Sequence, residues 1–194
     1  MNSNLQKSDL SVGFIGLGVM GHRMLTNMTA HGGFNIARAW DPDRQACELV
    51  KQSYPKIVIS ESAEDLVRDK EVDVVYIASP PASHHAHALL AAAAGKAIYC
   101  EKPLGVDISS SSEMVDAVEI AGVLNVVNFP FADSQPINFI ETKLADNVIG
   151  DVKGVDLRLH FSSWPRDWQD TARWLTLREQ GGFIREVVSH YVYL

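Results

Sequence analysis

The chain has 194 residues, of which 46% are hydrophobic and 21% charged, a balance typical of a folded globular protein and not of a disordered or fibrous one. Its formal net charge of −7 argues against a nucleic-acid or membrane-surface partner, since both favour a basic patch. Residues 1–10 do not resemble a secretory signal, and no apolar stretch is long enough to span a bilayer. Because Cys47 and Cys100 are the only cysteines, no disulfide framework is expected, and the sequence predicts a cytoplasmic protein.

Short β-rich runs alternate with helical patterns from residue 12 to residue 129. Strands are predicted over residues 12–15, 36–40, 57–59, 72–78, 97–100 and 125–129. Helices are predicted over residues 21–31, 44–52, 63–70, 83–94 and 110–121. Continuous apolar runs such as 74–78 are typical of strands that crossover helices bury on both faces. The alternation predicts an α/β fold with a doubly wound parallel sheet.

The pattern changes after Pro130, where we place a domain boundary. A helix is predicted over residues 135–147, and Gly150 then leads into residues 152–161. There, apolar and polar residues alternate, which indicates a half-buried antiparallel strand. Since a lone strand is not stable, it needs partners from later sequence or from another chain.

A glycine-rich turn follows the first predicted strand with the spacing G-x-G-x-x-G. Gly16 allows a tight turn, Gly18 lets the backbone approach a pyrophosphate, and Gly21 lets the next helix pack closely. The helix N-terminus then offers free amides to the phosphates, and Met20 lies in the same loop. The motif predicts a Rossmann dinucleotide site, although glycine-rich turns occur in many folds.

An acidic residue ends the second predicted strand. Asp41 lies where a carboxylate can accept hydrogen bonds from the adenosine ribose and repel a 2′-phosphate, which favours NAD over NADP. Arg44 keeps NADP open as the alternative, because it could stack on adenine or pair with a 2′-phosphate. The other interpretation of Asp41 is that it caps the following helix.

Glu101-Lys102-Pro103 follows the fifth predicted strand, at the sheet edge where open α/β folds bind ligands. Together with the glycine loop and the segment 78–84, this tripeptide resembles the glucose-fructose oxidoreductase / inositol dehydrogenase / MocA (Gfo/Idh/MocA) family. The resemblance implies that Lys102 lies beside the nicotinamide, where its cation stabilises a developing alkoxide. It implies further cofactor contacts at Ser79, which replaces the usual threonine, and at Pro80, His84 and Glu101. The alternative for Lys102 is a solvated surface lysine.

A second signature of that family is a glycine pair followed by an aspartate and, four residues later, a histidine. Here Gly181-Gly182 precedes Glu186 and His190 at the same spacing, with glutamate in the aspartate position. On a helix these two side chains share a face, so His190 is the expected proton acceptor and Glu186 its orienting partner. The alternative is a simple helical surface pair.

The resemblance implies an NAD(P)-binding Rossmann domain over residues 1–130 and a partial substrate and oligomerisation domain, of α+β type, over residues 131–194. It implies a homo-oligomeric oxidoreductase acting on a sugar, polyol or cyclitol. Relatives continue well beyond the histidine, so a non-catalytic dinucleotide-binding module or an inactive truncated remnant remains the alternative. A phosphate-binding transferase would keep the glycine loop but not require the later motifs.

No metal is predicted, because the histidines His84, His85 and His87 lack carboxylate or cysteine ligands at useful spacing.

Overall fold

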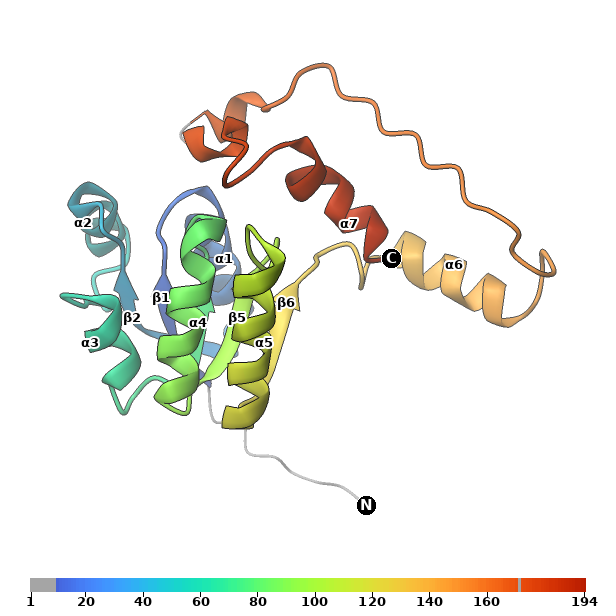
Figure 1. The fold of residues 1–194 in the computed structure, drawn as a ribbon. Helices are drawn as coiled ribbons and strands as arrows, with labels where there is room; N and C mark the ends of the chain where they lie inside the picture. The colour runs from blue at the N-terminus through green and yellow to red at the C-terminus, as the bar shows by residue number, and fades with distance from the viewer. Residues whose placement is uncertain (1–9, 171) are drawn as a thin grey trace. The chain divides into compact units, whose positions relative to one another are not determined.

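The computed structural model describes residues 10–170 and 172–194 (Figure 1). The chain divides into two compact units between Asn128 and Phe129. The polar N-terminal stretch 1–9 lies outside the described residues. Within the described ranges, none of the helices is long and apolar enough to cross a membrane.

The first unit is built on a six-stranded sheet with the order β3-β2-β1-β4-β5-β6. Every neighbouring pair of strands is parallel. The strands are β1 (Leu10–Ile15), β2 (Phe34–Trp40), β3 (Val58–Ile59), β4 (Val74–Ile77), β5 (Ala97–Glu101) and β6 (Asn125–Asn128). The strand order reverses between β1 and β4, which makes this pair the topological switch point where such sheets bind ligands. The predicted doubly wound α/β fold is confirmed.

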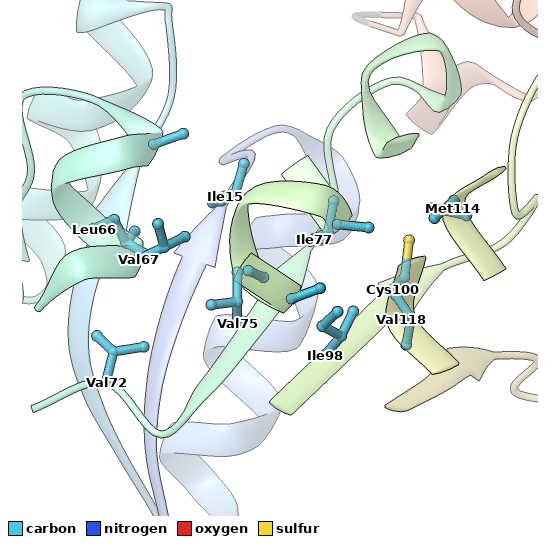
Figure 2. Close-up of a cluster of buried hydrophobic side chains, with 14 residues drawn as sticks. Ile15, Leu66, Val67, Val72, Val75, Ile77, Ile98, Cys100, Met114 and Val118 are labelled. Carbon is cyan, nitrogen blue, oxygen red and sulfur yellow. The ribbon is translucent and has the colours of Figure 1, made fainter. Parts of the chain in front are cut away.

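Helices cover the two faces of this sheet and create two separate cores. The helices are α1 (Val19–His31), α2 (Arg44–Ser53), α3 (Ala63–Arg68), α4 (His84–Ala93) and α5 (Ile108–Ala121), with a 3₁₀ turn η1 at Pro81–Ser83. Helices α3, α4 and α5 pack on one face, where Ile15, Val75 and Ile77 are fully buried (Figure 2). On the other face, Phe14 and Tyr76 pack with residues of α1 and α2. Successive strand residues point to opposite faces, which explains the continuous apolar runs. Each large apolar side chain buried in this way stabilises the fold by about 1.5–3 kcal/mol.

Local capping chemistry sets the helix ends. Asp43, Ser62 and Asp107 each precede a helix and accept a hydrogen bond from a backbone amide of its first turn. Helix α5 therefore begins at Ile108, two residues before the predicted start. Helices α1 and α5 end at Gly32 and Gly122, which adopt the left-handed conformation at φ +68° and +64°.

The second unit contains α6 (Gln135–Ala145), the 3₁₀ turns η2 (Asp167–Gln169) and η3 (Arg173–Thr176), the π-helix η4 (Ile184–Val188) and α7 (Ser189–Val192). The expected antiparallel strand over residues 152–161 is not formed: this segment has no regular secondary structure. Val155, which the alternation places on an inward face, is 87% exposed. The physical reason is that no described residue of this unit forms a partner strand, so the backbone cannot complete a ladder.

Candidate functional site

The residues predicted to bind the cofactor gather at one edge of the sheet. Gly16 follows β1, Asp41 follows β2, Ser79 follows β4 and Lys102 follows β5. Because all these strands are parallel, their carboxyl ends meet at the same edge. The structure therefore brings together four segments that are far apart in the sequence.

The three glycines of the loop differ in what surrounds them. Gly16 has φ +98°, and a Cβ there would lie 2.5 Å from the Ser79 amide nitrogen. A Cβ on Gly21 would lie 2.1 Å from the Gly16 carbonyl oxygen. Gly18 is exposed, and nothing lies within 4 Å of the position of its Cβ. Gly16 and Gly21 thus shape the turn, while Gly18 leaves open space at its apex.

The open apex lies at the N-terminus of α1. Gly18 is the N-cap of this 13-residue helix and supplies no side-chain cap, so the first-turn amides are not satisfied by a capping side chain. Such a helix end attracts anions through its free amides and its dipole. The loop therefore fits a pyrophosphate group. Met20 is half-buried within the first turn.

Asp41 joins the glycine loop to the end of β2. Its Oδ2 accepts a hydrogen bond from the Leu17 amide at 2.7 Å, and its Oδ1 accepts one from the Asp43 amide at 2.8 Å. The cap of α2 is Asp43, which accepts from the Gln45 amide at 2.9 Å, and not Asp41. Arg44 is the exposed first residue of α2. The half-buried Asp41 carboxylate is thus held beside the glycine loop by two backbone amides.

His84 links the loop after β4 to the loop after β5. It is 1% exposed, with Nε2 at 2.8 Å from the Ser79 carbonyl oxygen and Nδ1 at 3.0 Å from the Pro103 carbonyl oxygen. Ser83 Oγ adds a hydrogen bond to Ser79 Oγ at 2.8 Å. His84 therefore lies inside the unit and fixes the two loops to each other.

We expect the stability of the first unit to fall as the pH drops below the ordinary His84 pKa of 6.5. Burial is the largest effect on this pKa and lowers it, although the two carbonyl contacts oppose the shift. Between the two pKa values the unfolded chain binds a proton at His84 that the folded chain does not bind. The stability that is present above pH 6.5 is therefore lost as the pH falls towards the folded-state pKa. The measurement is the urea midpoint at about pH 8 and about pH 5.5.

His84→Gln should reduce this pH difference, and His160→Gln, at an exposed position, should leave it unchanged. Burial also lowers the pKa of His87, so part of the difference remains in both variants. An identical pH difference in His84→Gln and wild type would contradict the assignment.

Glu101 is a buried carboxylate with partners on both neighbouring strands. It is 5% exposed, and its Oε1 accepts hydrogen bonds from Tyr76 Oη at 2.5 Å and from Asn128 Nδ2 at 2.8 Å. Burial and the nearby carboxylate raise the pKa of Tyr76, so its hydroxyl stays a donor. Sequence reasoning missed Tyr76 and Asn128. The available signal was that a tyrosine inside a buried strand needs a partner for its hydroxyl.

The second unit holds the other predicted pair. A Cβ on Gly181 would lie 2.4 Å from the Leu175 carbonyl oxygen, and Gly182 has φ +92°. This tight turn precedes the π-helix that carries Glu186, which is 8% exposed. His190 follows in α7, and its ring centroid lies 4.6 Å from that of Phe131. The pair lies on consecutive helical turns, but the first turn is a π-helix and not the predicted α-helix.

The histidines of α4 have ordinary structural surroundings. His85 Nε2 lies 3.2 Å from Glu113 Oε2 on α5, and the His87 ring packs edge-on against Trp40 with centroids 5.9 Å apart. Across residues 10–170 and 172–194, no three His, Cys, Asp or Glu side chains are grouped so as to hold a metal ion.

Comparison with known proteins places this geometry among oxidoreductases. Residues 10–129 match the model of an oxidoreductase family with an NAD-binding Rossmann fold, named GFO_IDH_MocA. The inositol 2-dehydrogenase of Agrobacterium fabrum is 33% identical over 143 residues, which cover 72% of this chain and 42% of that protein. An uncharacterized oxidoreductase of Streptococcus pneumoniae is 29% identical over 172 residues, 88% of this chain and 45% of that protein. The chain thus spans less than half the length of these two relatives.

Solved structures show the same fold. An NAD-binding protein from Listeria innocua superposes with a TM-score of 0.80 at 24% identity, covering 95% of this chain and 53% of that one. An NAD-binding oxidoreductase from Klebsiella pneumoniae gives a TM-score of 0.66 at 31% identity, covering 74% of this chain and 40% of that one.

Proposed function

Because the chain belongs to the Gfo/Idh/MocA oxidoreductase family, which has an NAD-binding Rossmann fold, we propose that it transfers a hydride between a nicotinamide cofactor and a secondary alcohol or its ketone. The observation that carries this proposal is the placement of the open glycine loop and the Lys102 loop at the same sheet edge. A dinucleotide held by the first can extend towards the second.

The first unit supplies the groups that would hold the cofactor. The amides at the start of α1, beside Gly18, bind the pyrophosphate. The Asp41 carboxylate accepts hydrogen bonds from the ribose hydroxyls and repels a 2′-phosphate, which favours NAD over NADP. When bound, the nicotinamide supplies the hydride acceptor for alcohol oxidation.

Lys102, Glu186 and His190 supply the remaining chemistry in this proposal. The Lys102 ammonium donates a hydrogen bond to the substrate oxygen and stabilises the alkoxide that develops there. A ring nitrogen of His190 takes the hydroxyl proton, and returns it in the reverse reaction. Glu186 orients the imidazole through its buried carboxylate. These three roles come from the family resemblance.

A polyol, sugar or cyclitol is the proposed substrate class. Its support is the similarity to the inositol 2-dehydrogenases of Agrobacterium fabrum and Paracoccus denitrificans. We assign cofactor binding to residues 1–130, and assign to residues 131–194 a part in substrate binding and in the assembly of a homo-oligomer.

Two measurements on the protein test the proposal. In a fluorescence titration, NADH should bind at least about tenfold more tightly than NADPH, because Asp41 repels the extra phosphate. Polyols, inositols among them, are then screened for reduction of NAD⁺, and at least one should be oxidised. Saturable NADH binding without turnover of any polyol would favour a non-catalytic dinucleotide-binding module, and no binding of either cofactor would overturn the proposal.

A further inference from the structure

The geometry points to Tyr76 and Asn128 as positioning residues for Lys102, acting through the Glu101 carboxylate. This inference rests on the proposed function, because it assigns Lys102 a place at the reacting substrate. It concerns two residues outside the glycine loop, Tyr76 on β4 and Asn128 on β6.

The three side chains come from three adjacent strands at their carboxyl ends. Asn128 is the register partner of Glu101 across β5 and β6, and Tyr76 is the register partner of Tyr99 across β4 and β5. Tyr99 and Glu101 are two residues apart on β5 and share a face of the sheet. Glu101 Oε1 is therefore reached from both sides, by Tyr76 Oη at 2.5 Å and by Asn128 Nδ2 at 2.8 Å.

A buried carboxylate is costly unless hydrogen bonds satisfy it. Glu101 is 5% exposed, and the donors on β4 and β6 meet that requirement while fixing its side chain in one place. If the end of β5 served packing alone, an apolar residue in place of Glu101 could be buried at a lower cost in free energy. The polar network instead fixes the residue directly before Lys102.

The residue directly after Lys102 is fixed as well. Pro103 is buried, and its carbonyl oxygen lies 3.0 Å from Nδ1 of the buried His84. Lys102 itself is half-buried between these two anchored neighbours. Its backbone is thus held on both sides. In the proposed function the Lys102 charge must meet a developing alkoxide, and a displacement of about 1 Å can cost roughly 10²-fold in rate.

The test uses Tyr76→Phe and Asn128→Leu in the protein, with Tyr99→Phe as the matched control. The control removes a neighbouring tyrosine hydroxyl and keeps both Glu101 hydrogen bonds. We expect kcat to fall about tenfold in each test variant, with NADH affinity and KM unchanged, because the backbone around Lys102 loosens. In a Lys102→Met background the same changes should cause no further loss, since they act through Lys102.

A second readout does not depend on turnover. In protein labelled with ¹³C at lysine Cε, the Lys102 NMR signal, assigned with Lys102→Arg, should shift or broaden in Tyr76→Phe and Asn128→Leu and stay unchanged in Tyr99→Phe. An unchanged Lys102 signal in both test variants, or an equal change in the control, would overturn the inference. If wild type oxidises no polyol while this signal responds as expected, the proposed function fails, and what stands is that Tyr76 and Asn128 hold Lys102 in place.

Discussion

Replacing Gly16 with alanine will abolish measurable NADH binding and destabilise the first unit by about 3 kcal/mol or more. Two causes add: the backbone at φ +98° is strained for any residue with a Cβ, and that Cβ would lie 2.5 Å from the Ser79 amide nitrogen. Backbone atoms cannot move away as a flexible side chain can. The change is measured by urea unfolding and by NADH fluorescence titration.

Gly18→Ala separates binding from folding. Gly18 has φ −71° and open space around its Cβ position, so stability should change by no more than about 0.5 kcal/mol. The added methyl group enters the space proposed for the pyrophosphate, and NADH affinity should fall about tenfold or more. Gly154→Ala, at an equally open position in the second unit, should change neither quantity. Wild-type NADH affinity in Gly18→Ala would show that no pyrophosphate lies at the loop apex.

Lys102→Met should lower kcat for polyol oxidation by roughly 10²–10³-fold, the usual effect of removing one donor to a developing oxyanion. NADH affinity should stay the same, because the pyrophosphate and ribose contacts are elsewhere. The measurement pairs steady-state kinetics with NADH titration of the same preparation. Methionine matches the lysine side chain as far as Cε and removes the terminal ammonium group, with its charge and its donors.

Lys70→Met is the control for this experiment. Lys70 is exposed and lies between α3 and the amino end of β4, whereas the site loops follow the carboxyl ends of the strands. Its replacement should leave kcat within about twofold of wild type. Equal turnover in Lys102→Met and wild type would remove Lys102 from the mechanism.

The sheet and the glycine loop could be predicted because their signals are local. Six apolar or β-branched runs separated by helical patterns define six parallel strands, and glycines at fixed spacing define a turn that only glycine can make at Gly16 and Gly21. The placement of Asp41 after the second strand was predictable for the same reason, although the sequence left open whether Asp41 caps the next helix. The structure gives that cap to Asp43, two residues later.

Long-range contacts could not be predicted in the same way. Tyr76 and Asn128 are 25 and 27 residues from Glu101, and only the strand register brings them together. His84 was expected to line the cofactor from its place in the motif, but its burial and its two carbonyl contacts depend on two loops meeting. The alternation over residues 152–161 indicated a strand, but alternation is not sufficient without a partner.

The bridge formed by His84 between Ser79 and Pro103 restricts protein engineering. The loops after β4 and β5 are the natural places to insert or delete residues when substrate scope is to be altered, yet each carries one of the two carbonyl groups that the buried imidazole contacts. A library that varies either loop and preserves its carbonyl position should yield more folded variants than a library of the same loop that does not preserve it.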